Sequence, residues 1–116
     1  MAELLVDTDV FVDHLRGARP LSANAHSLAY SVITRCELFA GRQADERAVR
    51  LLLAPFREVP VTRQIAELAG KLRRQTGVRT PDALIAASAL SEGRALVTRN
   101  PRDFEAIEDL TIRPPT

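Results

Sequence analysis

Short unbroken apolar runs alternate with amphipathic stretches along this chain. The run Leu4–Val6 is apolar throughout, as expected of a strand buried on both faces of a sheet, and Ala95–Val97 has the same character near the other end. Between them, Ile65 to Leu72 places apolar side chains at i, i+3, i+4 and i+7, which is the spacing of an amphipathic helix. Strands joined by helices run parallel with right-handed crossovers, so the pattern predicts an α/β fold.

Start and stop signals supply the remaining elements. Thr8 or Asp9 is expected to cap a helix that Gly17 ends, and Thr34 with Glu37 three residues later fits a capping box. The predicted strands are Leu4–Val6, Leu28–Val32, a short piece within Phe56–Val61, Ala95–Thr98 and Leu110–Ile112. The predicted helices lie after Asp9, from Thr34 to Gly41, from Arg42 to Ala54, from Thr62 to Gly77 and from Thr80 to Leu90, with a helical turn near Asp103 and a loop over Ala18–Ala25.

Length and composition favour a single domain over residues 1–116, because 116 residues with 46% hydrophobic content support one core. Cys36 is the only cysteine, so no internal disulfide can form, and a small buried apolar role is expected for it. The N-terminal apolar run is too short to span a membrane, and Glu3 stands where a signal peptide needs basic residues. We therefore expect a cytoplasmic protein with no membrane partner.

The charges nearly cancel, with 16 basic against 15 acidic residues and a formal net charge of +1. Such a balance gives no strong sign of a nucleic-acid, membrane or acidic partner. All the basic residues except Lys71 are arginine, whose planar fork suits phosphate and carboxylate groups. A genomic bias toward arginine codons explains the same composition equally well.

Four carboxylates stand at the ends of predicted elements: Asp7, Glu37, Asp82 and Asp103. In an open α/β sheet the ligand crevice lies outside the carboxyl ends of the strands, where these four side chains can meet. Taken singly, each has a structural explanation. Asp7 can cap a helix, Glu37 can belong to a capping box, Asp82 can be stabilised by the helix dipole in a first turn, and Asp103 can be a solvated turn residue. Taken together, they predict a shared acidic pocket.

Clustered acids repel one another unless a cation lies between them, and Mg²⁺ and Mn²⁺ prefer carboxylate oxygens and water. Such a metal can activate water and position a phosphodiester, so the pocket predicts metal-dependent phosphodiester hydrolysis. Neutral groups at strand ends, namely Thr8, Thr98 and Asn100, can hold a metal-bound water or orient a carboxylate. Other titratable residues are interpreted as a cap or surface groups, namely Asp9, Asp13, His14 and His26.

Four segments together form a recognisable pattern: Leu5-Val6-Asp7-Thr8-Asp9-Val10, Ser31-Val32-Ile33-Thr34-Arg35-Cys36-Glu37-Leu38, Pro81-Asp82-Ala83-Leu84-Ile85-Ala86-Ala87 and Leu96-Val97-Thr98-Arg99-Asn100-Pro101-Arg102-Asp103-Phe104. With these segments in this order, the chain resembles the PIN-domain ribonucleases over nearly its full length, and among them the VapC toxins of bacterial and archaeal toxin–antitoxin pairs. The resemblance implies a three-layer α/β/α domain with a short central parallel sheet. It also implies that Asp7, Glu37 and Asp82 are the core metal-binding acids.

The resemblance leaves the fourth acid open, because relatives differ in whether the position of Asn100 or that of Asp103 supplies it. Asp9 departs from the family pattern, in which Asn is more usual, and adds a negative charge beside Asp7. Further implications are an RNA substrate, a homodimer and an antitoxin that wraps the toxin and places a basic side chain into the pocket. Candidate RNA contacts beside the pocket are Arg35, Arg79, Arg99 and Arg102.

Two other interpretations compete with a Mg²⁺- or Mn²⁺-dependent endoribonuclease. In a phosphatase of the haloacid-dehalogenase type, Asp7 attacks phosphorus and Asp9 serves as acid and base, but the chemistry also needs a lysine near a later strand. The only lysine, Lys71, falls on a predicted amphipathic helix. In a non-catalytic interaction domain, the acids are caps and the arginines bind a partner.

Overall fold

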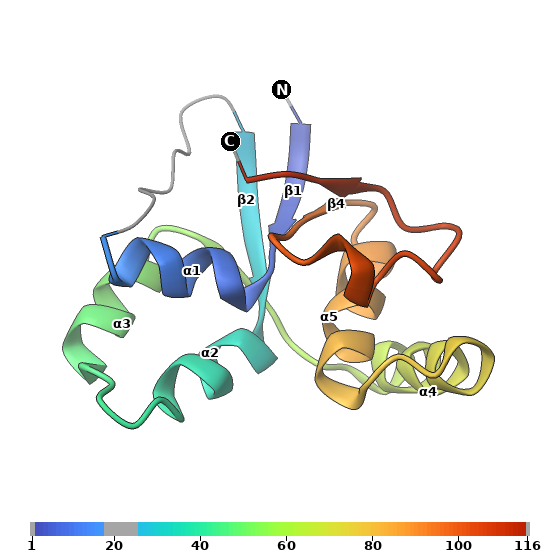
Figure 1. The fold of residues 1–116 in the computed structure, drawn as a ribbon, viewed down its shortest axis with the longest axis horizontal. Helices are drawn as coiled ribbons and strands as arrows, with labels where there is room; N and C mark the ends of the chain where they lie inside the picture. The colour runs from blue at the N-terminus through green and yellow to red at the C-terminus, as the bar shows by residue number, and fades with distance from the viewer. Residues whose placement is uncertain (1, 18–25, 116) are drawn as a thin grey trace.

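The computed structural model describes residues 2–17 and 26–115 and contains a five-stranded parallel sheet in the order β3-β2-β1-β4-β5 (Figure 1). The strands are β1 (Ala2–Val6), β2 (His26–Ser31), β3 (Arg57–Val59), β4 (Ala95–Val97) and β5 (Ile112–Arg113). The helices are α1 (Thr8–Leu15), α2 (Val32–Phe39), α3 (Glu46–Leu53), α4 (Arg63–Thr76) and α5 (Thr80–Ser91), with a 3-10 turn, η1, at Pro101–Asp103. The predicted α/β class and the short parallel sheet are confirmed.

Helices cover both faces of the sheet, which gives the predicted three layers. In Figure 1, α1, α2 and α3 lie on one side of the strands, and α4 and α5 lie on the other. The two faces have separate cores, because successive side chains of a strand point to opposite faces: Leu4 and Val6 of β1 pack toward the first group of helices, whereas Leu5 packs toward α4 and α5. Within the described residues, no helix has the length and apolar character needed to cross a membrane.

The register brings the ends of β1 and β4 together. Val6 pairs with Val97, and the backbone N–H of Asp7 donates to the Val97 carbonyl over 2.9 Å. Asp7 and Thr98 are the residues that follow the two strands, so they meet at the carboxyl edge of the sheet. This edge is where an open parallel sheet places its ligand crevice.

Several element boundaries differ from those predicted, because side chains cap helices at earlier positions. Asp7, and not Thr8 or Asp9, is the N-cap of α1, and its carboxylate accepts from the Thr8 N–H. The N-cap of α2 is Ser31, whose hydroxyl accepts from the Ile33 N–H over 3.1 Å. Helix α2 therefore starts at Val32, and the predicted capping box of Thr34 and Glu37 is wrong.

Two later boundaries also differ from those predicted. Helix α3 starts at Glu46 behind the cap Asp45, several residues after the predicted Arg42. The cap position of α5 is Arg79, one residue before the predicted Thr80. Helix α4 matches its prediction at both ends, with Thr62 as the N-cap and Gly77 ending it at φ 77°, a conformation that favours glycine. The last strand is Ile112–Arg113, and the predicted loop over residues 18–25 lies outside the described residues.

Candidate functional site

Asp7 lies at the centre of the acidic site, buried where β1 gives way to α1. Asp7 is only 7% exposed. Each of its carboxylate oxygens accepts one hydrogen bond, Oδ1 from the Thr8 N–H and Oδ2 from the Thr98 hydroxyl, both over 2.8 Å. Burial and then the charge of Asp9 raise the pKa of Asp7 to about 7, although the two hydrogen bonds act in the opposite direction. Asp7 is thus an acid that is costly to ionise without a neighbouring cation.

Asp9 is neither a cap nor a surface group, contrary to the prediction. Its carboxylate is half-buried and accepts from the Asn100 side-chain amide over 2.7 Å and from the Arg99 backbone N–H over 3.2 Å. The Thr98 hydroxyl, which donates to Asp7, also lies 3.3 Å from Asp9 Oδ2. Asp9 therefore ties the turn after β4 to the first turn of α1, and the predicted site residue Asn100 contacts Asp9 directly.

Glu37 reaches the site through a chain of two hydroxyl groups. The Thr8 hydroxyl donates to Glu37 Oε1 over 2.6 Å and lies 2.9 Å from the hydroxyl of Thr34, which is fully buried. Because a hydroxyl has one proton and Thr8 donates it to Glu37, Thr34 must be the donor to Thr8. Helix α2 is thereby connected to the start of α1, and the Glu37 carboxylate is held near that of Asp7.

Asp82 and Asp103 complete the cluster from α5 and η1. Asp82 lies in the first turn of α5, where burial, followed by the charges of Asp103 and Glu37, raises its pKa. Arg79 partly offsets this rise, and the charge of Asp82 in turn contributes to the raised pKa of Asp7. The four acids predicted to share a pocket therefore interact electrostatically.

This donor set fits a hard divalent cation. Burial and neighbouring carboxylates raise the pKa of both Asp7 and Asp82, and a cation neutralises the negative charge that causes this. Among residues 2–17 and 26–115, no group of three or more acidic, histidine or cysteine side chains is arranged so that it could hold a metal ion. Mg²⁺ commonly binds through one or two carboxylates and keeps several waters, so it does not need a complete cage of protein ligands.

A salt bridge between Arg99 and Asp13 joins the turn after β4 to helix α1, beside the acidic site. The guanidinium of Arg99 donates from Nη1 to Asp13 Oδ1 over 2.6 Å, and Asp13 is only 7% exposed. The prediction that Asp13 is a surface group is wrong. It lies one turn beyond Asp9 on the same helix, and i, i+4 spacing places both carboxylates toward the turn that follows β4.

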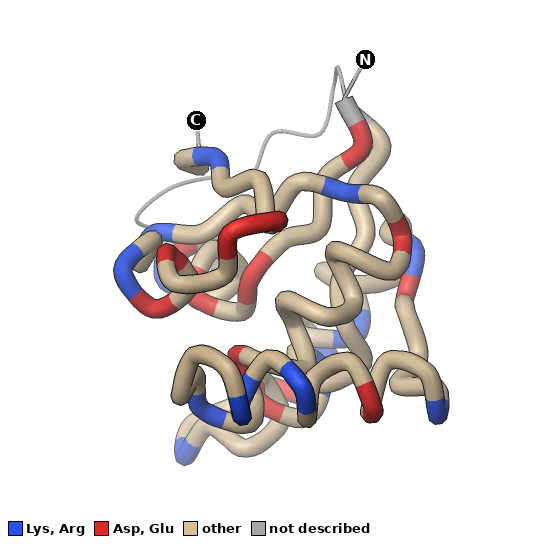
Figure 2. Tube along the Cα trace, turned by 90° about the vertical axis from the view of Figure 1, so that its right-hand side faces the viewer, with Lys and Arg blue, Asp and Glu red and all other residues tan. Residues whose placement is uncertain are grey.

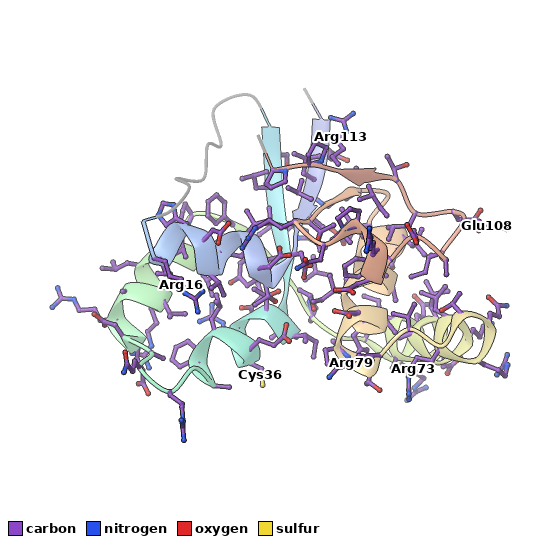
Figure 3. The ribbon with its side chains drawn as sticks, in the orientation of Figure 1. Arg16, Cys36, Arg73, Arg79, Glu108 and Arg113 are labelled. Carbon is purple, nitrogen blue, oxygen red and sulfur yellow. The ribbon has the colours of Figure 1, made fainter. Side chains whose placement is uncertain are left out.

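Sequence reasoning missed Asp13 and Thr34 as parts of the site. The available signal for Asp13 was its helical spacing from Asp9, and that for Thr34 was its spacing of three residues from Glu37. Cys36 was expected to be buried, but it is exposed, and Figure 3 shows it pointing outward from α2. The side chains of α2 that pack into the core on this side of the sheet are those of Leu38 and Phe39.

The four candidate arginines have different environments. Arg35 is engaged away from the acids, donating to Glu58 over 2.6 Å and to the Tyr30 hydroxyl over 3.0 Å. Arg79 lies at the start of α5 (Figure 3) and lowers the pKa of Asp82, and Arg99 contacts Asp13. Arg102 is exposed on η1. Arg79 and Arg99 therefore lie close to the acidic cluster.

Comparison with known proteins gives one consistent family. The family described as "PIN domain" matches residues 4–110. "Ribonuclease VapC10" of Mycobacterium tuberculosis is 40% identical over 124 residues, which cover 97% of this chain and 92% of that protein. "Ribonuclease VapC19" of the same species is 35% identical over 120 residues, covering 91% and 95%. The chain therefore belongs to the PIN-domain family, in the group of the VapC proteins.

Solved structures agree with this assignment. A toxin–antitoxin complex from Klebsiella pneumoniae contains a chain with a TM-score of 0.79 and 28% identity, covering 97% of this chain and 98% of that one. The DNA-bound VapBC from Salmonella typhimurium has a TM-score of 0.77 and 27% identity over the whole of both chains. The phosphatase and interaction-domain interpretations find no support, and Lys71 is exposed on α4.

Proposed function

We propose that this chain is an endoribonuclease that uses Mg²⁺ or Mn²⁺, and the toxin of a toxin–antitoxin pair. The observation that carries the proposal is the acidic cluster, in which burial and mutual repulsion raise the pKa of both Asp7 and Asp82. The relatives named as ribonucleases, which align along almost the whole chain, support RNA as the substrate.

Asp7 and Asp82 are the primary metal ligands in this proposal, with Glu37, Asp103 and Asn100 as further members of the site. A bound Mg²⁺ or Mn²⁺ supplies Lewis acidity, which activates water and stabilises the charge that develops on the leaving oxygen. The protein orients its own carboxylates: Thr98 and the Thr8 N–H hold Asp7, and the Thr8 hydroxyl holds Glu37. Because a metal ligand must be deprotonated, Asp7, whose pKa is raised to about 7, would hold the cation as its carboxylate.

Cleavage of RNA by the purified chain tests the proposal. Wild type is incubated with single-stranded RNA and Mg²⁺ or Mn²⁺ and compared with Asp7→Asn and Asp82→Asn, which keep the size of the side chain and remove its charge. Asp109→Asn is the matched control, because Asp109 is an exposed aspartate outside the cluster. We expect both site variants to lose cleavage and the control to retain it. Unchanged cleavage in both site variants contradicts the assignment of the site.

A neutralising protein partner and a homodimer are further parts of the proposal. The partner rests on the solved relatives, several of which are toxin–antitoxin complexes, and the homodimer rests on the family resemblance. Expression of this chain is expected to arrest growth, and co-expression of a small protein encoded next to it is expected to relieve the arrest. Light scattering of the purified chain measures the dimer directly.

A further inference from the structure

A groove of about 620 Å³ opens beside the acidic site, between the turn after β4 and the C-terminal strand. It is lined by Thr98, Arg99, Pro101, Ile112, Arg113 and the pair Pro114–Pro115. Thr98 belongs to both places, because its hydroxyl donates to Asp7 and its side chain also lines the groove. The backbone N–H of Thr98 donates to the Arg113 carbonyl over 3.2 Å, so the groove begins one residue from the acids and follows the edge of the sheet.

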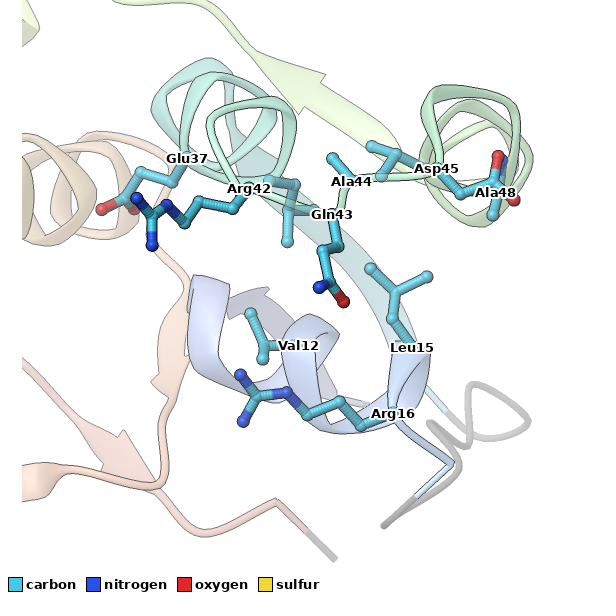
Figure 4. A pocket seen from close by; sticks show the side chains of 12 residues that line it. Val12, Leu15, Arg16, Glu37, Arg42, Gln43, Ala44, Asp45 and Ala48 are labelled. Atoms are coloured by element: carbon cyan, nitrogen blue, oxygen red, sulfur yellow. The ribbon is translucent and has the colours of Figure 1, made fainter.

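The lining of this groove is basic. Arg99 and Arg113 are its two charged residues, and no carboxylate lines the groove within the described part of the chain. The larger groove of about 670 Å³ differs in this respect: it lies between α1 and the segment after α2, and its arginines, Arg16 and Arg42, share it with Glu37 and Asp45 (Figure 4). Arg113 also borders a neighbouring pocket of about 440 Å³, which Glu3 and Asp109 line.

The two guanidinium groups are held by different means. Arg99 is braced by Asp13 through Nη1, yet its side chain remains 43% exposed, so the other N–H groups can meet a ligand. Arg113 is exposed and has its backbone fixed by pairing with β4, where Val97 is its partner. Residues 2–17 and 26–115 show no carboxylate in ion-pair contact with Arg113.

The remaining surface of the groove is apolar and stiff. Pro101, Pro114 and Pro115 have a fixed φ, and Ile112 is half-buried between them and the core. A groove with two arginines and no carboxylate suits the sugar–phosphate backbone of a single nucleic-acid strand, whose phosphates meet the cations. Basic groups are needed here because the acidic site repels RNA. The molecule as a whole does not attract RNA strongly, since residues of both signs are spread over it (Figure 2) and its net charge is only +1.

We propose that this groove binds the sugar–phosphate backbone of single-stranded RNA next to the phosphodiester that is cut, with Arg99 and Arg113 as phosphate contacts. The inference rests on the proposed ribonuclease function. It adds a binding direction: the RNA strand runs from the acidic site, past Thr98, toward the C-terminal strand. Asp13 is then a positioning residue, since it orients Arg99.

The test measures RNA binding separately from RNA cleavage. In an Asp7→Asn background, which keeps the RNA intact, the affinity for a fluorescently labelled single-stranded oligoribonucleotide is measured by anisotropy over a range of KCl concentrations. Arg113→Ala is expected to weaken binding about three- to tenfold, as expected for one partly exposed phosphate contact. The slope of log affinity against log salt is expected to fall by about 0.7, the value for one phosphate contact on a single strand.

The controls separate this inference from the proposed function. Arg74→Ala removes an exposed arginine from the far end of α4 and should change neither affinity nor slope. Thermal melts should be the same for Arg113→Ala and its parent, because only the backbone of Arg113 pairs with β4. If wild type cuts RNA while Arg113→Ala binds it as the parent does, the inference is wrong and the function stands. If wild type neither binds nor cuts RNA, both are wrong. If Arg113→Ala weakens only the capture of a co-expressed antitoxin, the groove is a protein-binding surface and the inference is again wrong.

Discussion

Arg99 Nη1 lies 2.6 Å from Asp13 Oδ1, in a salt bridge between residues 86 positions apart. The pair joins the turn after β4 to α1, and the Arg99 backbone N–H reaches Asp9 on the same helix. A buried carboxylate that loses its cationic partner destabilises the folded protein, whereas an exposed salt bridge contributes little to folding stability. This pair is intermediate, because Asp13 is buried and Arg99 is partly exposed.

We expect Asp13→Ala to lower the free energy of unfolding by about 1–3 kcal/mol, measured by urea denaturation. A double-mutant cycle with Arg99→Ala isolates the salt bridge from the other contacts of both side chains. Coupling of about 1 kcal/mol or more is expected. Strictly additive single effects contradict a stabilising role for the pair.

The stability of the metal-free protein should fall as pH rises through the range in which Asp7 ionises. The pKa of Asp7 is raised from 3.8 to about 7 in the folded state, so the folded state binds a proton that the unfolded state has already released. The stabilisation from this proton is fully present below about pH 4 and is lost as pH rises through about 7, and it amounts to at most about 4 kcal/mol.

Asp7→Asn removes this pH dependence and should therefore be more stable than wild type at pH 8 in EDTA, with a difference that shrinks toward pH 4. Denaturation curves at several pH values measure it. Added Mn²⁺ should narrow this difference at pH 8, since a ligand that binds only the folded protein stabilises it by about 2.7 kcal/mol at a concentration 100 times its Kd. Equal melting shifts with Mn²⁺ in the two proteins contradict Asp7 as a ligand.

Thr98→Val should disturb the site without changing its shape. The substitution removes the donor to Asp7 and the acceptor for the Asn100 N–H at a position only 1% exposed. Leaving buried polar groups unpaired costs about 1–3 kcal/mol. It should also raise the pKa of Asp7 further, because the Thr98 hydrogen bond lowers that pKa. Thr111→Val, at an exposed position, is the control and should change stability by less than about 0.5 kcal/mol.

Asp9→Asn tests the residue that departs from the family pattern. An asparagine oxygen can still accept from the Arg99 N–H, but the charge that raises the pKa of Asp7 is gone. We expect the pH at which metal-free stability declines to shift downward, and Mn²⁺ to bind more weakly because the site has one negative charge fewer. If neither the pH profile nor the Mn²⁺ affinity changes, the charge of Asp9 does not act on Asp7.

Hydrophobic patterning predicted the fold well, because strands buried on both faces and helices with one apolar face leave strong signals. Leu4–Val6 and Ala95–Val97 became neighbouring strands, and the predicted α4 began at Thr62 and ended at Gly77 as expected. The helix caps were harder to predict, because Asp7 and Thr8 are both suitable N-cap residues. Only the path of the backbone decides which side chain reaches the unpaired N–H groups of the first helical turn. Ser31 was overlooked for the same reason.

Sequence reasoning placed four acids at element ends, and their roles as site residues stay a prediction. Asp7 and Asp82 lie at the starts of α1 and α5 and Asp103 lies in η1, but Glu37 lies in the second half of α2 and not in its first turn, because that helix starts at Val32. The hydrogen bond from Thr98 to Asp7 and the salt bridge from Arg99 to Asp13 join residues about 90 positions apart, and their partners follow from strand register and side-chain direction. No local pattern specifies such pairs, so Asp13 was wrongly interpreted as a surface group.

The placement of Thr98 links the site to the order in which the chain is synthesised. Asp7, Glu37 and Asp82 all precede β4, but the hydroxyl that holds Asp7 and the two N–H donors that hold Asp9, the Arg99 backbone and the Asn100 side-chain amide, come from residues 98–100. A nascent or truncated chain that ends before Thr98 therefore contains most of the acids without the contacts that orient them. For a nuclease that acts on RNA, this arrangement delays assembly of the active site until residues 98–100 have been made.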